Sequence, residues 1–432
     1  MRAIGRTMGA LSLALALALS SWMAAPAQAA GQTELETKIK TMEQALQSMK
    51  QQLEQVKQEQ ARQGQAVEVA ASKAAQAKLP SWVERMTFFG DTRFRYEHTN
   101  YDDTVIAGKT KTKSGVDRFR VRLRFGVRSQ IHPDVELGFR MASGSDTDGT
   151  STNQTMGNYF GEYSSWGIDQ AYVKWNPSFV PTKAATFSFG KVPQPFMTSK
   201  IIWDGDVVPE GGFINFTFNK GGGVQPFITA AYMTVNQSGE FGDNVLAPAV
   251  QAGAKVKLGS FRLDGALGYT SWGDLGDVGK LPPSLRGTPS YTEGGGTRTT
   301  NYAVFDAYAK ASFAFAPKGS LGVWGHYLKN NDSEGPYQDK DQGYGAGVFV
   351  KYDKFGFNLW YKSVEANATP GFIADSDSGY VNIKGWIANV SYKMWKYGTV
   401  ELSYYSMEPE DASISTASNK YQTVFVDFVF KF

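Results

Sequence analysis

Cysteine is absent from this chain of 432 residues, and only three histidines are present, namely His98, His132 and His326. The absence of cysteine excludes disulfides, thiolate metal sites, haem attachment through CxxCH and cysteine nucleophiles. Only His326 has serines or acids nearby in the sequence, and nothing marks a catalytic set around it. We therefore expect no enzyme activity, no metal site and no cofactor.

A large excess of one charge is also missing, because 44 basic residues face 41 acidic ones. This balance gives no reason to expect a nucleic-acid partner. Long apolar runs are missing beyond the N-terminal segment, although a membrane-spanning helix needs roughly 18 apolar residues in succession. Aromatic residues nevertheless make up 14% of the chain. If the chain spans a membrane, it must do so as a closed β-barrel, the other structure that satisfies every backbone polar group in lipid.

The N-terminal segment predicts a secretory signal peptide over residues 1–29. Arg2 and Arg6 precede an Ala/Leu-rich core, and Ala27-Gln28-Ala29 forms an A-x-A cleavage site. The alternative is a membrane anchor, but the apolar core is short for a spanning helix. The mature chain is expected to begin near Ala30.

Residues 30–80 are predicted to form a helical coiled-coil segment that ends at Pro80. Apolar residues alternate in steps of four and three, at Leu35, Ile39, Met42, Leu46, Met49, Leu53 and Val56. One helix cannot bury such a seam by itself, so the pattern implies a partner helix, most simply from another subunit. The alternative is an amphipathic helix that lies on the rest of the protein.

From Met86 onward the apolar pattern changes to a period of two, which is typical of β-strands with two different faces. Between residues 117 and 128, Arg118, Arg120, Arg122 and Arg124 alternate with apolar residues. A soluble core would not accept four arginines on one face, because unpaired buried charges are costly, whereas a water-filled lumen would. The pattern therefore predicts strands with one lipid-facing side and one lumenal side.

We predict sixteen such strands, so residues 81–432 are expected to form an all-β, transmembrane, antiparallel barrel. Eight long connections alternate with seven short ones, as in outer-membrane barrels with long extracellular loops and short periplasmic turns. This order places both ends of the barrel, and the coiled coil, in the periplasm. The predicted strands are 86–97, 117–128, 134–142, 167–176, 184–190, 212–218, 224–232, 247–258, 260–270, 302–315, 319–328, 343–353, 355–364, 382–394, 396–406 and 421–432.

Arginines of the first strands are expected to line one side of the lumen. This predicted basic wall consists of Arg93, Arg95, Arg118, Arg120, Arg122, Arg124 and Arg140. Such a wall would favour anions in a wide pore. The alternative is that lumenal carboxylates neutralise the arginines, which then only stiffen the wall.

Several features together resemble the putative porin family of Gram-negative bacteria. They are the A-x-A leader, the short coiled coil, the strand from Phe88 to Glu97, the arginine strand from Asp117 to Val127 and the terminal Phe432. The resemblance covers nearly the whole chain and implies a sixteen-stranded, trimeric, passive channel of the outer membrane. Aromatic residues at Phe428, Phe430 and Phe432 resemble the signature by which the barrel-assembly machinery recognises such proteins.

The resemblance also suggests a role for the third long loop, residues 191–211, because that loop folds into the lumen of general diffusion porins. Its candidate constriction residues are Asp204, Asp206 and Glu210, which could face the arginines. An exposed surface loop is the alternative. Phosphate is a minority option as the solute, since no lysine ladder is present.

The expected function is therefore an outer-membrane porin for small anionic or neutral solutes. The expected partners are other copies of the chain, outer-membrane lipid and possible peptidoglycan. Two alternatives stay open. One is an envelope tether or adhesin, in which the barrel anchors a binding coiled coil, and the other is an outer-membrane enzyme.

Overall fold

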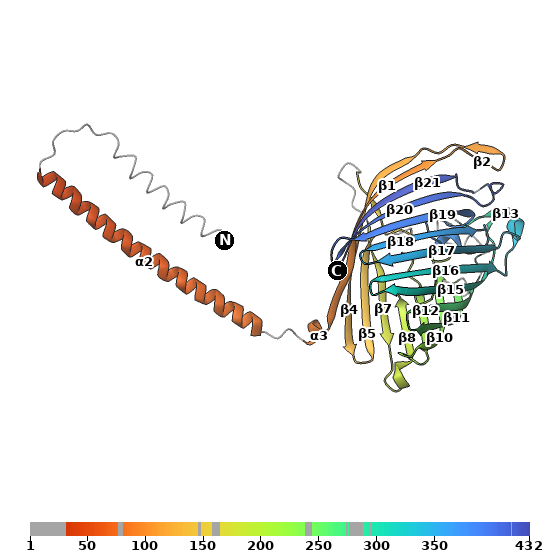
Figure 1. Cartoon of the computed structure of the whole chain (residues 1–432), viewed down its shortest axis with the longest axis horizontal. Coiled ribbons are helices and arrows are strands. Elements are labelled where there is room, and N and C mark those ends of the chain that lie inside the picture. Colours follow the sequence, from red (N-terminus) through yellow and green to blue (C-terminus); the bar gives the residue numbers. More distant parts are fainter. Residues whose placement is uncertain are drawn as a thin grey trace. The chain divides into compact units, whose positions relative to one another are not determined.

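The computed structural model describes residues 32–76, 81–145, 148–157, 165–237, 244–273, 275, 288–293, 296–415 and 417–432. It divides the chain into two compact units, Met1–Pro80 and Ser81–Phe432 (Figure 1). The predicted signal peptide over residues 1–29 lies outside the described residues. None of the described helices is long and apolar enough to cross a membrane.

The described part of the first unit is one long helix, α2 (Gln32–Gln76). Glu, Gln, Lys and Ala dominate its sequence, and all four favour helix. Six of the predicted seam residues, Ile39, Met42, Leu46, Met49, Leu53 and Val56, are each about half exposed. The side chain of Leu35 lies outside the part that the structure describes. An isolated α2 thus leaves an apolar seam uncovered.

The second unit is a closed antiparallel barrel of sixteen strands, as predicted, which follows the short helix α3 (Ser81–Glu84). Closure comes from β1, which pairs with β4 on one side and with β21 on the other. The strands are β1 (Met86–Tyr101), β4 (Val116–His132), β5 (Val135–Gly144), β7 (Ser165–Trp175), β8 (Ala185–Lys191), β9 (Glu210–Thr217), β10 (Val224–Asn236), β11 (Val245–Leu258), β12 (Phe261–Trp272), β15 (Tyr302–Ala316), β16 (Gly319–Asn330), β17 (Gln342–Tyr352), β18 (Phe355–Val364), β19 (Ile383–Lys393), β20 (Gly398–Pro409) and β21 (Tyr421–Lys431).

Shorter elements lie in the connections between these strands. The short strand β6 (Gln154–Thr155) adds to β4, while β2 (Thr104–Ile106) with β3 (Lys109–Lys111) and β13 (Tyr291–Glu293) with β14 (Gly296–Arg298) form separate hairpins. The 3-10 turns are η1 (Pro181–Lys183), η3 (Gly335–Tyr337) and η4 (Gly371–Ile373). Long connections alternate with short turns around the barrel, so one rim carries the long loops and the other the short turns.

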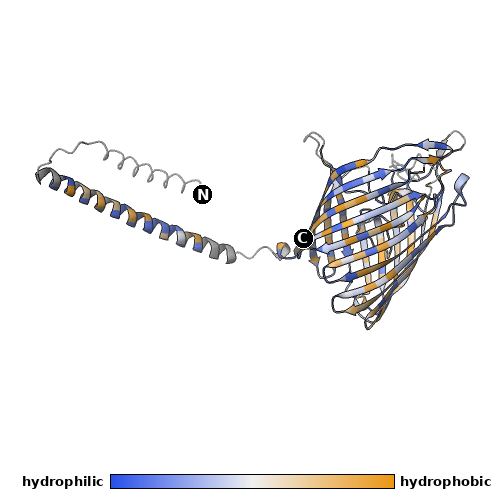
Figure 2. Cartoon of the chain, turned by 45° about the horizontal axis from the view of Figure 1, so that its top comes forward, coloured by the Kyte–Doolittle hydropathy of each residue, from blue (hydrophilic) through white to orange (hydrophobic). Residues whose placement is uncertain are grey.

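Alternate side chains are sorted between the two faces of the barrel wall. On β4, Phe119 is 62% exposed on the outer face. Arg122, three residues further along the strand, lies on the inner face and is 7% exposed. Figure 2 shows apolar and polar residues alternating along the strands. Phe428 and Phe432 are likewise exposed, and Gly90 and Phe432 exchange two backbone hydrogen bonds at the seam between β1 and β21. The outer surface is therefore apolar although the strands carry many charges.

Two long loops enter the barrel from the same rim. They are the 192–209 loop, between β8 and β9, and the 365–382 loop, between β18 and β19. Buried apolar residues of both loops, such as Ile201 and Ile373, join one cluster with inward residues of the wall such as Val304 and Leu328. Apolar packing consequently fills part of the interior, while cavities remain beside the arginines and around Pro195 and Lys255.

Candidate functional site

The arginines of β1 and β4 face the interior in direct opposition to one another. The register places Arg93 opposite Arg122 and Arg95 opposite Arg120. Like charges that face each other across two strands are destabilising. The arrangement therefore needs carboxylates nearby, and the same two strands supply the first of them.

Asp91 and Glu97 of β1 neutralise most of the arginines on β4. Asp91 lies 2.7 Å from the guanidinium nitrogens of both Arg122 and Arg124. Glu97 accepts from Arg118 at 2.7 Å and lies 3.4 Å from Arg120. Each carboxylate thus bridges two arginines, which lowers the repulsion and fixes the guanidinium groups in place.

The 192–209 loop adds a further carboxylate, Asp206, to this wall. Asp206 Oδ1 lies 3.1 Å from Arg124 and 3.6 Å from Arg122, while Oδ2 accepts two hydrogen bonds from Thr152. Burial alone would raise the pKa of Asp206, but Arg122 and Arg124 hold this pKa below its usual value. Asp206 therefore stays ionised against the arginines.

The other two predicted constriction acids are not in contact with the arginines. Asp204 is buried and accepts the backbone N–H groups of Asp206 and Ser376. Burial and the neighbouring Asp375 raise the pKa of Asp204 to about 8. Glu210 begins β9 and pairs with Lys191 on β8. Of the three candidate acids, Asp206 lies against the arginines of β4, and Asp204 and Glu210 have other partners.

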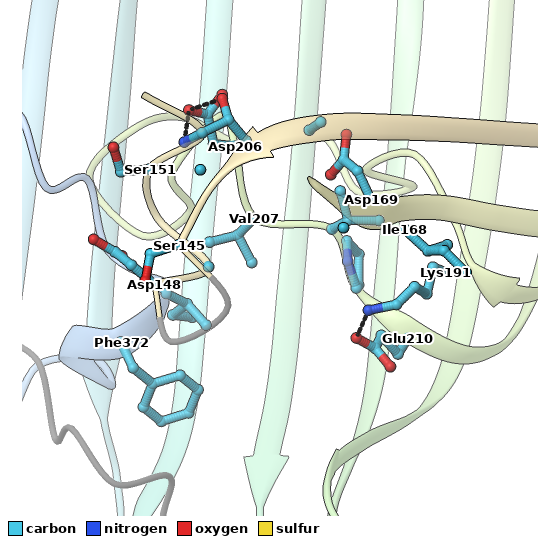
Figure 3. A pocket seen from close by; sticks show the side chains of 18 of the residues that line it. Ser145, Asp148, Ser151, Ile168, Asp169, Lys191, Asp206, Val207, Glu210 and Phe372 are labelled. Carbon is cyan, nitrogen blue, oxygen red and sulfur yellow. Dashed lines mark hydrogen bonds and ion pairs between the residues drawn. The ribbon is translucent and has the colours of Figure 1, made fainter. Parts of the chain in front are cut away.

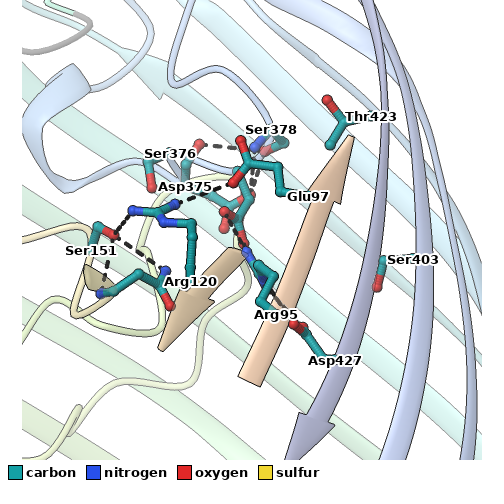
Figure 4. A network of polar contacts seen from close by, with 12 residues as sticks. Arg95, Glu97, Arg120, Ser151, Asp375, Ser376, Ser378, Ser403, Thr423 and Asp427 are labelled. Atoms are coloured by element: carbon teal, nitrogen blue, oxygen red, sulfur yellow. Dashed lines mark hydrogen bonds and ion pairs between the residues drawn. The ribbon is translucent and has the colours of Figure 1, made fainter. Parts of the chain in front are cut away.

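The 365–382 loop supplies a lumenal carboxylate that sequence reasoning missed. Asp377 accepts from Arg95 at 3.1 Å, and Arg95 also forms two hydrogen bonds of 2.8 Å with Asp427 on β21 (Figure 4). Arg95 and Lys200 lower the pKa of Asp377 despite its burial. The sequence around Asp377 differs in no visible way from that of an ordinary surface loop.

Two arginines of the predicted wall differ from the others. Arg140 on β5 pairs with Asp169 on β7, away from the central group. Arg93 donates to the side-chain oxygen of Asn153, and among the described residues it has no carboxylate within ion-pair distance. Arg93 is thus the wall arginine whose charge is least compensated.

A hydrogen-bonded chain of three side chains ties the 192–209 loop to the opposite wall. Ser199 Oγ lies 2.8 Å from His326 Nδ1, and His326 Nε2 lies 3.1 Å from Asp306 Oδ1. Sequence analysis found no serine, histidine and acid set, because Ser199 is 127 positions from His326. Gln251 on β11 adds two hydrogen bonds to the backbone of Met197.

Three cavities follow one another along the arginines. A loop-side cavity of about 740 Å³ reaches Asp206 and includes Lys191 and Glu210 (Figure 3). A middle cavity of about 240 Å³ extends from Asp206 to Arg93, and a short-turn cavity of about 560 Å³ continues from Arg93 toward Lys431. Neighbouring cavities share lining residues, so a polar route follows the arginine wall.

No group of three or more histidine or acidic residues in the described ranges could hold a metal ion. A closed antiparallel barrel with an apolar outer face and a charged interior is the architecture of an outer-membrane channel. A family model described as "Putative porin" matches residues 14–112 and 103–259, which is more than half of the chain. The chain belongs to this family.

Solved porin structures share the fold at low sequence identity. OprB of Pseudomonas putida, in a high-pH structure, is 12% identical over 82% of this chain and 96% of that chain, with a TM-score of 0.52. The Acinetobacter baumannii outer membrane channel DcaP is 14% identical over 80% and 97%, with a TM-score of 0.46. OmpF of Salmonella typhi, in complex with daunomycin, is 12% identical over 80% and 97%, with a TM-score of 0.48. No curated protein matches the chain significantly.

Proposed function

We propose that this protein is a passive diffusion channel for small hydrophilic solutes, with a preference for anions. The observation that supports the proposal is the polar route of three adjoining cavities beside the arginine wall. A route through the barrel serves diffusion only if water fills it, and the charged side chains along the wall favour that state. No moving part or energy source is needed for such a channel.

The anion preference rests on the short-turn cavity rather than on the whole wall. That cavity is lined by seven basic residues, Arg93, Arg95, Arg122, Lys200, Lys310, Lys351 and Lys431, but by three acids, Asp377, Glu401 and Asp427. The loop-side cavity has the opposite balance, with Lys191 against Asp148, Asp169, Asp206 and Glu210. We infer a channel that selects anions at its basic end and conducts unequally in the two directions.

The constriction is proposed to lie at the middle cavity. Arg122 and Arg124 line it and are paired directly with Asp206, at 3.6 Å and 3.1 Å. Closely spaced charges of both signs along a narrow passage order water and dipolar solutes. The remaining wall arginines, Arg118, Arg120 and Arg140, serve as paired structural charges in this proposal.

Planar-bilayer recording of the purified protein tests this function. We expect stepwise conductance in KCl and a reversal potential on the anion side in a salt gradient. Replacing Arg93 by Gln should shift that potential toward zero more than replacing Arg118 by Gln does, because Arg118 is paired with Glu97. A protein that inserts but never conducts would overturn the proposal.

The exposed seam of α2 favours a second function beside transport. We propose that α2 associates with the same helix of other copies, as a trimer in the periplasm, and that the coiled coil contacts peptidoglycan. The half-exposed Ile39, Leu46 and Leu53 support association. Analytical ultracentrifugation of the full chain should show a trimer, and Leu46→Asp should dissociate it. If the protein binds peptidoglycan but shows no conductance, the channel function is refuted and the function as an envelope tether remains.

We further propose three features of export and assembly. Residues 1–29 are removed as a signal peptide, residues 30–80 form the periplasmic segment, and residues 81–432 form the barrel. Phe428, Phe430 and Phe432 are proposed to be recognised by the barrel-assembly machinery. Mass spectrometry of the mature protein and outer-membrane yields of Phe432→Ser test these points.

A further inference from the structure

The short-turn cavity has one wall of a different character, formed by aromatic side chains of β15 to β18. Tyr308, Trp324, Phe349 and Trp360 line it together with the cations described above. The rings of Trp324 and Trp360 lie 5.6 Å apart, centre to centre. Trp324 is the partly exposed ring of this pair, whereas Trp360 is 4% exposed and belongs to the buried cluster behind it. The exposed part of Trp324 beside charged side chains is apolar surface at which a solute can bind.

Glycines on the strand between them allow the two tryptophans to come together. Trp324 is on β16 and Trp360 is on β18, and β17 separates these strands. A Cβ at Gly347 of β17 would lie 2.5 Å from the Trp360 Cβ and 2.8 Å from Trp324 Nε1. Because Gly347 has no side chain, both indoles lean over β17 and form a two-ring surface, here called the indole plate.

The same cavity places uncompensated cations within the reach of a solute on this plate. Arg93 has Asn153 as its polar partner, and its Nε is buried without a hydrogen-bond acceptor among the described residues. Lys310 Nζ lies 4.7 Å from the ring centre of Phe349 and has no ion pair in the described part of the chain. Both side chains therefore have charge available for an anion.

We propose that the indole plate and Arg93 form a binding site for small aromatic carboxylates, so that these solutes are taken up selectively. The inference rests on the proposed channel function and adds the class of solute. An aromatic ring stacks on the partly exposed Trp324 of the plate, which the buried Trp360 holds in place, and such contacts favour offset or tilted rings. The carboxylate accepts hydrogen bonds from Arg93, which are stronger than those between neutral groups. A volume of about 560 Å³ accommodates one ring with its carboxylate and water.

Sugars also stack on tryptophan, and the cavity has carboxylates and amides, such as Glu401 and Asn389, that can bind hydroxyl groups. The surplus of seven basic residues over three acids nevertheless argues for an anion. An aliphatic anion would use Arg93 and leave the exposed part of Trp324 in contact with water. The aromatic carboxylate is the one class that uses both features.

The test measures how benzoate, cyclohexanecarboxylate, benzyl alcohol and glucose reduce the single-channel KCl current of the full chain. We expect benzoate to block at a concentration at least fivefold below that of the other three probes. Trp324→Leu should remove this benzoate preference, and Arg93→Gln should raise the blocking concentration at least fivefold. Trp386→Leu on the outer face and Arg128→Gln, outside the cavity, are matched controls that should behave like the unmodified protein.

Saturation-transfer NMR of benzoate with the protein in detergent micelles gives a readout that needs no current. If the protein shows no conductance but gives benzoate signals that Trp324→Leu abolishes, the channel proposal is refuted and the binding site stands. If the protein conducts and benzoate and cyclohexanecarboxylate block it at equal concentrations, the binding site is refuted and the channel proposal stands. Stronger block by glucose would identify a sugar site and overturn the inference.

Discussion

The two sides of the barrel interior are stabilised by different kinds of interaction. Beside β1 and β4, arginines and carboxylates pair with one another around water-accessible space. Beside β15 to β19, the 192–209 and 365–382 loops bury apolar side chains against the wall. The apolar side therefore anchors the two loops and narrows the lumen. The charged side leaves a polar route beside them.

The largest effect is expected from a charge on the apolar side. Ile201→Asp places a carboxylate at a fully buried position beside Gly345 and should cost about 3–5 kcal/mol of loop anchoring. We expect the 192–209 loop to leave the lumen and the single-channel conductance to rise at least twofold. Val105→Asp, at a site exposed in the β2–β3 hairpin, is the control. Unchanged conductance in Ile201→Asp would show that the loop does not limit the passage.

A slightly smaller effect should follow from breaking the polar side. Arg95→Leu leaves Asp377 and Asp427 without their shared cation, and removal of one partner from a buried pair costs about 3 kcal/mol. We expect a lower melting temperature of the barrel in detergent, measured by the heat-dependent shift in electrophoretic mobility. Arg118→Leu, where the guanidinium is 36% exposed, should change the melting temperature far less. Equal shifts would argue against buried pairing as the source of stability.

A moderate effect is expected on ion selectivity when Asp206 loses its charge. Asp206→Asn leaves Arg122 and Arg124 with Asp91 as their carboxylate partner, which increases the positive field in the middle cavity. The anion-to-cation permeability ratio should rise about twofold, as measured by reversal potentials in a KCl gradient. Glu210→Gln is the matched control because Glu210 pairs with Lys191 instead. A ratio that rises equally in both variants would contradict the assigned position of the constriction.

The smallest effect should be a change with pH at the boundary between the two sides. The pKa of Asp204 is raised to about 8, mainly by burial and then by Asp375, with Lys200 opposing the rise. A carboxyl whose pKa is raised in the folded state stabilises that state at low pH. Its contribution is lost as the pH rises from the ordinary value of 3.8 through about 8. We therefore expect loop anchoring to weaken between about pH 4 and about pH 8.

Open-channel current noise at these two pH values measures that loss. Asp204→Asn keeps a neutral side chain of the same size, so its noise should change little over the same range. Asp148→Asn in the loop-side cavity is a control for general effects of removing an acid. Noise that increases with pH equally in Asp204→Asn would assign the effect to another group.

The barrel could be predicted from the sequence because its wall obeys a local rule. From Arg118 to Phe125 of β4, arginine and apolar residues alternate without interruption, so the residue type at each position indicates the face on which it lies. The sixteen predicted strands match the observed ones to within a few residues, and the arginines turned inward as expected. Apolar and charged residues alternate along the strand because one face of the wall contacts lipid and the other contacts water.

The site was less accessible to sequence reasoning because its contacts join distant segments. Asp377 and Arg95 are 282 positions apart in the sequence, and no local pattern predicts their contact. Glu210 was grouped with the constriction acids, but β9 begins at this residue and aligns it with Lys191. Arg93 has a neutral partner, Asn153, instead of a carboxylate. Asn153 lies in a loop, and no periodic sequence pattern predicts the conformation of that loop.

The seam between β1 and β21 has a consequence for biogenesis. Arg95 lies on β1 and one of its two carboxylate partners, Asp427, lies on β21, so both ion pairs of Arg95 exist only once these strands have paired. A partly assembled barrel would carry an unmatched guanidinium at its open edge and would stay attractive to water or to a chaperone. Closure of the cylinder and neutralisation of this buried cation are thus coupled, which makes late assembly cooperative rather than gradual.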